Sequence, residues 1–320
     1  MSYENFQVLR MILAAFGWEV DKRMVTRILN SFRVVGQFTK FGIVFFVFLV
    51  GLAGYLSSTP SMHQLDWAHL CLFLFGLCAL AAGSLSLNQI QEVEVDRKMQ
   101  RTLRRPLVTG DLSWSAGVGL SVGLLMVGTS ALAYVSAESL ILGLVVVLLY
   151  NGFYTLWWKP SWVFAAVPGA IPGALPITMG YAANTHDIFT PDSLYLFLIV
   201  FLWQMPHFWA LAVKYQNDYT QADVPVLPAQ LGLQRTFFHM GLYTFVYVGL
   251  ALSAPWFVHA RWFHLLLVVP FAVKVLVEFF RYTRAHQRWL PFFAWVNLSV
   301  LVFVFVPVFE KLLKSHGTFH

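Results

Sequence analysis

Three oxygen-bearing side chains, Asn88, Glu92 and Asp96, recur at four-residue intervals at the end of a long apolar segment. On a helix this spacing places them along one face, about 6 Å apart along the axis. Magnesium prefers oxygen ligands, and proteins commonly hold it with one or two carboxylates while phosphate oxygens and water complete its shell. The stripe therefore predicts a Mg²⁺ site that binds a phosphorylated substrate.

Positive charge follows directly after this stripe. The basic residues of the segment are Arg97, Lys98, Arg101, Arg104 and Arg105. Arginine binds phosphate oxygens through paired donors. We therefore expect this segment to neutralise a diphosphate beside the metal.

A second acidic segment, KYQNDYTQADVPVLP (residues 214–228), follows a later apolar segment. We expect Asp218 and Asp223 to face the first stripe across one cavity, where two metal ions would clamp a diphosphate and stabilise the leaving group. In the alternative interpretation these acids belong to solvated helix ends, with Glu94 in a surface salt bridge and Asp223 in water. Both interpretations require helices that end at the same membrane boundary.

The composition identifies the elements that position these residues as membrane helices. Of 320 residues, 58% are hydrophobic and only 11% are charged, whereas a soluble domain carries about 25% charged residues. Apolar segments of about 20 residues, enough to cross a hydrocarbon core, recur along the chain. The fold class predicted is an all-α polytopic membrane protein with spans at 38–58, 67–90, 114–135, 139–158, 162–183, 193–213, 236–257, 262–280 and 291–313.

Charge placement predicts the topology. Most of the 21 basic residues fall in the N-terminal segment and in the loops after the even-numbered spans, and such residues are retained on the cytoplasmic side. We expect a cytoplasmic N-terminus and a C-terminus on the opposite side. This placement accounts for the net charge of +6 without a nucleic-acid partner. Within the eighth span, Lys274 and Glu278 are spaced to pair on a helix.

The domain organisation predicted is simple. Residues 37–320 form one membrane domain, because the loops are too short for another. Residues 1–36 form a cytoplasmic segment in which apolar residues recur at helical spacing between basic ones, which is typical of an amphipathic helix on the membrane surface. Charged residues interrupt this segment, so it is not a signal peptide.

Several strings resemble the UbiA-type intramembrane prenyltransferases, and within them the heme branch. The stripe fits the family pattern N-x-x-x-D-x-x-x-D, and residues 96–107 read DRKMQRTLRRPL. Further strings similar to this branch are QFTKFG (37–42), YTLWWK (154–159), PGALPITMGYAA (172–183), FLWQMPHFWALA (201–212) and DYTQADVPVLP (218–228). The chain departs from the usual residues at Phe41, Gln89, Glu92 and Asp223.

The resemblance implies a nine-helix UbiA-type bundle with a cavity open to the lipid bilayer. It implies transfer of a farnesyl group from farnesyl diphosphate to a vinyl group of protoheme IX, with addition of water, to give heme O. The catalytic and Mg²⁺-binding residues implied are Asn88, Glu92, Asp96 and Asp218, with Asp223 as a further metal ligand. The diphosphate would be bound by Lys40, Arg101, Arg105, Tyr154, Lys159 and Lys214.

His207 is a candidate for contact with the heme iron or a propionate, because histidine is a common heme ligand and ionisable groups inside spans are usually functional. Trp203 and Gln204 would contact the same acceptor. Alternatively, His207 hydrogen-bonds backbone carbonyl groups that Pro206 leaves free.

Other functions remain open at the level of the sequence. One is a UbiA-type enzyme that prenylates a quinone precursor or another ring. Others are a transporter and a heme-binding assembly factor without catalysis. We expect a bacterial inner-membrane location and contact with a heme A synthase or a terminal oxidase assembly.

Overall fold

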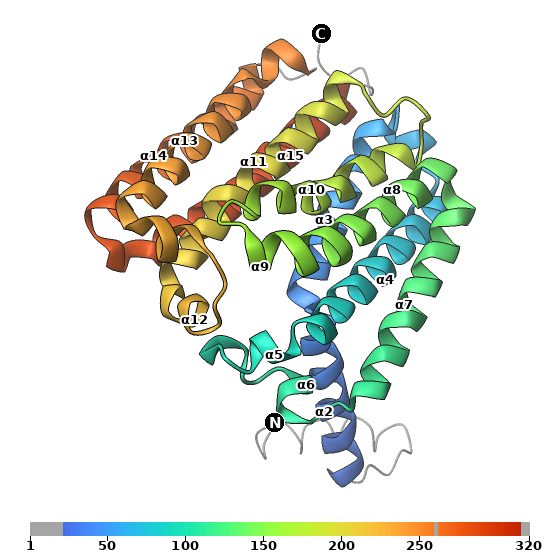
Figure 1. The fold of residues 1–320 in the computed structure, drawn as a ribbon. Helices are drawn as coiled ribbons and strands as arrows, with labels where there is room; N and C mark the ends of the chain where they lie inside the picture. The colour runs from blue at the N-terminus through green and yellow to red at the C-terminus, as the bar shows by residue number, and fades with distance from the viewer. Residues whose placement is uncertain (1–21, 259–261, 315–320) are drawn as a thin grey trace.

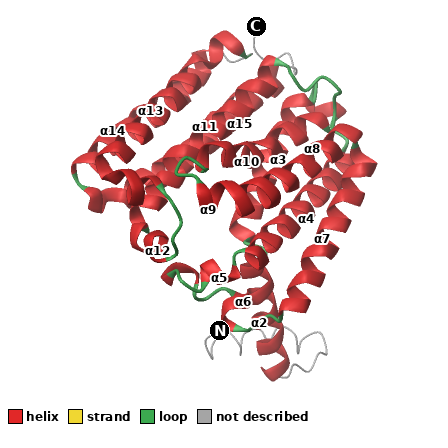
Figure 2. Cartoon of the chain, viewed as in Figure 1, coloured by secondary structure: helices red, strands yellow, loops and turns green. Residues whose placement is uncertain are grey.

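A computed structural model describes residues 22–258 and 262–314 of the chain. The described residues form helices joined by short loops, and they contain no strand (Figure 2). The long helices are α2 (Lys22–Phe38), α3 (Phe41–Ser58), α4 (Trp67–Gln91), α7 (Trp114–Val135), α8 (Ala137–Val147), α10 (Ala166–Ala182), α11 (Pro191–Lys214), α13 (Leu227–Phe257), α14 (Trp262–Arg284) and α15 (Trp289–Lys314).

Shorter helical segments connect them. Helix α8 continues into the π-helix η3 (Leu148–Trp158) and then α9 (Lys159–Ser161). The remaining segments are η1 (Met62–Gln64), α5 (Val93–Asp96), η2 (Gln100–Thr102), α6 (Pro106–Thr109), α12 (Gln216–Gln221) and η4 (His286–Arg288). Segment α5 therefore carries Asp96 at the end of the acidic stripe, and the basic residues that follow it lie between α5 and α6.

Eight helical stretches among the described residues are long and apolar enough to cross a membrane. Each corresponds to one of the nine predicted spans. The remaining prediction, 162–183, coincides with α10, whose 17 residues contain Pro172 and Pro176. At a rise of 1.5 Å per residue, α10 is about 26 Å long and falls short of a hydrocarbon core of about 30 Å. The helical membrane fold is confirmed, while the count of nine stays a prediction.

The helices gather into two groups that meet at α10 (Figure 1). Helices α3, α4, α7 and α8 lie on one side, and α11, α13, α14 and α15 on the other. Helix α10 contacts α3, α8 and α11, and α15 contacts α3 and α11. A cavity is thus framed by elements far apart in the sequence.

Glycines allow α3 and α10 to touch backbone to backbone. A Cβ atom at Gly54 would lie 1.9 Å from the carbonyl oxygen of Ile177, and one at Gly180 would lie 2.1 Å from that of Gly51. Small residues at such crossings are typical of membrane helix pairs. This contact fixes the distance between the two walls of the cavity.

Helix α2 confirms the helical part of the predicted segment 1–36 from Lys22 onward, and the rest of that segment lies outside the described residues. Ile28, Leu29 and Phe32 are exposed on α2, and its place on a membrane surface stays a prediction. The chain then turns at Lys40, whose backbone is left-handed at φ 53°. This turn separates α2 from α3 and brings Lys40 to the cavity.

Three ion pairs lie outside the cavity. Lys274 donates to Glu278 at 2.8 Å, as predicted from their spacing, and Arg281 joins the same carboxylate at 2.9 Å. Lys311 joins Asp192 at 2.6 Å and connects the beginning of α11 to α15.

Candidate functional site

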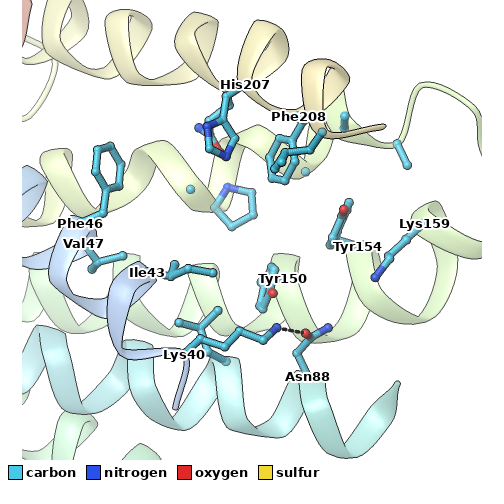
Figure 3. Close-up of a pocket in the computed structure, with 18 of the residues that line it drawn as sticks. Lys40, Ile43, Phe46, Val47, Asn88, Tyr150, Tyr154, Lys159, His207 and Phe208 are labelled. Carbon is cyan, nitrogen blue, oxygen red and sulfur yellow. Dashed lines mark hydrogen bonds between the residues drawn. The ribbon is translucent and has the colours of Figure 1, made fainter. Parts of the chain in front are cut away.

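A cavity of about 690 Å³ lies between α3, α4, η3, α10 and α11. The polar end of the cavity differs in chemistry from the wall that lies across from it (Figure 3). Lys40, Asn88 and Lys159 lie at a polar end, whereas His207 and Phe208 project from α11 on the opposite wall. The cavity can therefore bind a molecule with an anionic group and a large apolar body.

The acidic stripe is divided between the cavity wall and the layer behind it. Asn88 and Glu92 line the cavity, and the buried Asp96 lies one turn farther along in α5. Glu92 is paired with Lys159 and Asp96 with Arg105. The end of α4 and the short helix α5 thus bring Asn88 and Glu92 to the cavity wall and Asp96 to the layer behind it.

The pKa values of the two carboxylates differ because their surroundings differ. Burial raises the pKa of Glu92, but the charges of Lys159 and Lys40 outweigh burial and hold that pKa below its usual value. For Asp96, burial is the larger influence, and its pKa is raised although Arg105 partly offsets the effect. The site therefore keeps Glu92 ionised in the part that faces the cavity.

Lys40 donates a hydrogen bond from Nζ to Oδ1 of Asn88 at 2.6 Å. Burial, followed by the charge of Arg105, lowers the pKa of Lys40 to about 7. An anion in the cavity would favour the protonated amine of Lys40 through charge attraction. Lys40 therefore places an amine that an anion could engage at the surface of the cavity.

The π-helix η3 orients Asn88. Asn88 donates from Nδ2 to Oγ1 of Thr155 at 3.0 Å, and the Thr155 hydroxyl donates to the carbonyl oxygen of Tyr150 at 2.7 Å. Asn151, on the same segment, donates to the carbonyl oxygen of Ser84 at 2.9 Å. These bonds set the amide of Asn88 so that its oxygen, not its nitrogen, faces Lys40.

The two acidic segments meet through Arg101. Its backbone N–H donates to Oδ2 of Asp218 at 3.0 Å, and its guanidinium donates to the hydroxyl of Tyr219 at 2.8 Å. The guanidinium also lies over the rings of Tyr215 and Tyr219, 5.4 and 5.0 Å from their centroids. The structure thus brings the segment after α4 against α12 at the polar end.

His207 on the aromatic wall is held by a polar partner from α15. Its Nδ1 atom lies 2.8 Å from Oδ1 of Asn297, and Asn297 donates from Nδ2 to the carbonyl oxygen of Phe293 at 2.6 Å. The alternative prediction, a bond to backbone carbonyl groups beside Pro206, is wrong, because an asparagine side chain binds His207.

Trp203 and Gln204 line the same wall. The amide nitrogen of Gln204 donates to the carbonyl oxygen of Ala170 at 2.9 Å, and a Cβ at Gly173 would lie only 2.1 Å from its Oε1 atom. The indole nitrogen of Trp203 is buried without a hydrogen-bond partner among the described residues. The Trp203 ring thus contributes apolar surface to this wall.

Known proteins are similar to this chain in sequence and in fold. Residues 38–299 match the sequence pattern of the UbiA prenyltransferase family. The chain belongs to this family. A protein named protoheme IX farnesyltransferase from Bdellovibrio bacteriovorus is 53% identical to the chain over 281 residues, which cover 87% of this chain and 96% of that protein.

Solved structures confirm the UbiA fold. The apo structure of a UbiA homologue from Aeropyrum pernix K1 has a TM-score of 0.65 at 16% identity and covers 86% of this chain and 98% of its own. A UbiA homologue from Archaeoglobus fulgidus bound to GPP and Mg²⁺ has a TM-score of 0.57 at 16% identity, with 86% and 99% covered. The predicted bundle is therefore the UbiA fold.

Four residues predicted for the UbiA site do not line the cavity: Asp96, Asp218, Lys214 and Asp223. Asp96 and Asp218 are buried, and they are bound by the Arg105 side chain and by the backbone N–H of Arg101. Lys214 lies with Nζ 5.3 Å from the ring centroid of Trp289. Asp223 has a side chain that is 85% exposed and lies 3.5 Å from Nζ of Lys98. Tyr154, by contrast, lines the cavity, and the absence of a side chain at Gly169 leaves room for its ring.

The residues that could hold a metal in this UbiA site offer oxygen atoms only. Among the described residues, no three His, Cys, Asp or Glu side chains are grouped closely enough to form a metal site by themselves. Mg²⁺ needs only one or two carboxylates when a diphosphate supplies further oxygens. Asn88 and Glu92 on the cavity wall fit that requirement, and Asp96 and Asp218 are further carboxylates close behind them that could supply oxygen atoms.

Sequence reasoning missed Thr155, Asn151 and Asn297 as residues of this UbiA site. Each is a polar residue within an apolar segment. Polar groups at such positions are costly and are usually retained for a reason. That signal was available, but the partners of these residues depend on contacts between helices.

Proposed function

We propose that this protein transfers a farnesyl group from farnesyl diphosphate to a vinyl group of protoheme IX to form heme O. The observation that carries the proposal is the cavity with a cationic, carboxylate-bearing end and an aromatic wall. A diphosphate suits the first end, and an isoprenoid and a porphyrin suit the second. The name of the Bdellovibrio bacteriovorus relative supports the same substrates.

The basic residues of the polar end bind and orient the diphosphate. Lys40, Arg101, Arg105 and Lys159 line the cavity at this end, and their charges stabilise the negative charge that develops on the leaving group. Lys214 would need to move from Trp289 to take part. Tyr154 lines the cavity between this end and the aromatic wall, where its ring would lie beside the reacting carbon (Figure 3).

Mg²⁺ would be held by Asn88, Glu92, Asp96 and Asp218, and it would supply electrostatic assistance to departure of the diphosphate. The Archaeoglobus fulgidus structure, which holds GPP and Mg²⁺, supports a divalent ion in the family. Asp223 is a weaker candidate ligand because its side chain is largely exposed. The ion pairs with Lys159 and Arg105 hold Glu92 and Asp96 in place when the substrate is absent.

The acceptor heme would lie against Trp203, Gln204 and His207. Its vinyl group must reach C1 of the farnesyl chain, so the ring lies between α11 and the polar end. We further propose that the enzyme works in a bacterial inner membrane and passes heme O to a heme A synthase or an oxidase assembly. Co-purification with these proteins tests that step.

The test of the reaction uses purified protein with farnesyl diphosphate, heme and Mg²⁺, and mass spectrometry of the heme product. We expect a farnesylated, hydrated heme that is lost with EDTA and strongly reduced in Asp96→Asn and Glu92→Gln. Glu94→Gln is the matched control, because Glu94 is exposed and pairs only with Arg97 among the described residues.

Other outcomes of this experiment identify the alternatives. Prenylation of a quinone precursor but not of heme would retain the enzyme class and reject the acceptor. Heme binding without consumption of farnesyl diphosphate would indicate an assembly factor, and movement of a solute across vesicles without such consumption would indicate a transporter.

A further inference from the structure

The reaction proposed above releases a proton. The vinyl group forms a carbon–carbon bond to C1 of the farnesyl chain while the bond from C1 to the diphosphate oxygen breaks. The remaining vinyl carbon is left electron-poor, and the oxygen of a water molecule bonds to it. One O–H bond of that water must then break, so a base has to accept the proton.

We propose that Nε2 of His207 accepts this proton, and that Asn297 is the positioning residue that prepares it. The proposal rests on the proposed function, since it assigns a step within that reaction. It goes beyond heme contact, because it gives His207 a catalytic role and gives Asn297 a purpose.

The hydrogen bonds of Asn297 determine which nitrogen of His207 carries the proton. The carbonyl oxygen of Phe293 only accepts, so the amide nitrogen of Asn297 faces it at 2.6 Å. The amide oxygen therefore faces Nδ1 of His207 at 2.8 Å, and Nδ1 must be the donor. In the neutral ring, Nε2 then carries the lone pair.

Two aromatic neighbours hold the His207 ring in place at the cavity wall. The rings of Trp203 and Phe293 each lie 4.8 Å from the His207 ring, centroid to centroid. The ring projects from α11 toward the wall that carries Lys40 and Asn88 (Figure 3). No described residue forms a hydrogen bond with Nε2, so this atom is available to water.

The other titratable side chains of the cavity are poorly suited to this step. Lys40 and the other basic groups serve as donors at the diphosphate end, and Glu92 is paired with Lys159. Tyrosine side chains are weak bases when neutral. Among the described residues on the acceptor side of the cavity, His207 is thus the basic side chain that forms no ion pair.

The test compares products in ¹⁸O-water. Wild-type protein should give farnesylated heme carrying the label in its hydroxyl group. His207→Ala and His207→Gly should form hydroxylated heme about 10²-fold more slowly, with a prenylated product lighter by one water in its place. Added imidazole should restore the hydroxylated product in both variants, and Asn297→Ala should show a smaller loss.

Three controls separate this role from others. The His186 side chain is exposed, so His186→Ala should form hydroxylated heme at the wild-type rate. The absorbance spectrum of bound heme should be the same in wild type and in the His207 variants, because loss of an iron ligand would change that spectrum and a base acting on water would not. Thermal unfolding and size-exclusion profiles should show that the variants are folded.

The proposal is overturned if either His207 variant hydroxylates heme at the wild-type rate, which would assign the proton to the departing diphosphate. It is also overturned if imidazole restores heme binding rather than rate, or if the loss resists imidazole in both variants. A wild-type protein that prenylates no heme would instead reject the proposed function.

Discussion

Nζ of Lys40 and Oδ1 of Asn88 lie 2.6 Å apart although 48 positions separate the two residues. The bond joins the turn before α3 to the acidic stripe of α4. It places a cation beside the proposed metal ligand, where a diphosphate would bridge the two.

Replacing Lys40 tests its role in diphosphate binding. Lys40→Met should lower kcat/KM for farnesyl diphosphate about 10²-fold, the loss typical for one preorganised donor. Lys40→Arg should recover part of it, because charge is kept. Lys98→Met, at an exposed lysine, serves as the control in the same steady-state assay. Equal effects of Lys40→Met and Lys98→Met would contradict the assignment.

Thr155 should act through Asn88. Thr155→Val removes the acceptor for the Asn88 amide and keeps the shape, and the loss of about 1 kcal/mol corresponds to about a fivefold fall in kcat/KM. Thr155→Ser should restore activity and the apparent affinity for Mg²⁺. A serine variant as impaired as the valine variant would show that packing, not the hydrogen bond, matters.

Divalent cations should bind together with the substrate diphosphate. The acidic groups are paired with basic side chains and are not grouped as a complete metal site among the described residues. We expect Mn²⁺ titrations followed by electron paramagnetic resonance to show binding at least about tenfold tighter with an unreactive farnesyl diphosphate analogue, and coupling is reciprocal. Tight Mn²⁺ binding by the protein alone would reject this expectation.

The α3–α10 contact should be sensitive to a single methyl group. Gly180→Ala would place Cβ against the carbonyl oxygen of Gly51, and overpacking of this kind costs about 1–3 kcal/mol. Gly123→Ala, in α7 where nothing lies within 4 Å, should leave the unfolding temperature in detergent unchanged or higher. The reverse order of the two unfolding temperatures would contradict the contact.

Local spacing was enough to predict that Asn88 and Glu92 share a face at the end of α4, because i and i+4 residues of a helix do so whatever surrounds them. It did not predict that α4 ends at Gln91 and that Asp96 belongs to the separate helix α5. It also predicted the pair of Lys274 and Glu278. The nine-span count was less secure, since hydropathy measures apolar length and α10 contains two prolines. The π-helix η3 could not be predicted either, because its hydrogen-bond pattern leaves no clear trace in apolar periodicity.

Contacts between distant segments were predicted only in outline. Two acidic segments on one membrane side implied that they meet, but not that the backbone of Arg101 joins them. Lys214 is one example. The sequence predicted that it lies at the cytoplasmic membrane boundary and binds diphosphate, but its amine lies over the ring of Trp289 and does not line the cavity. The partner of His207 lies 90 positions away, beyond any local pattern.

The left-handed backbone of Lys40 has opposite consequences for the stability and the activity of this protein. A non-glycine residue in that conformation costs about 1–2 kcal/mol, and glycine would relieve most of it. Lys40→Gly should therefore unfold at a higher temperature and work worse, because glycine has no amine to offer the substrate. At this turn the chain keeps a strained lysine where glycine would be more stable, a trade of stability for activity that is common at functional sites.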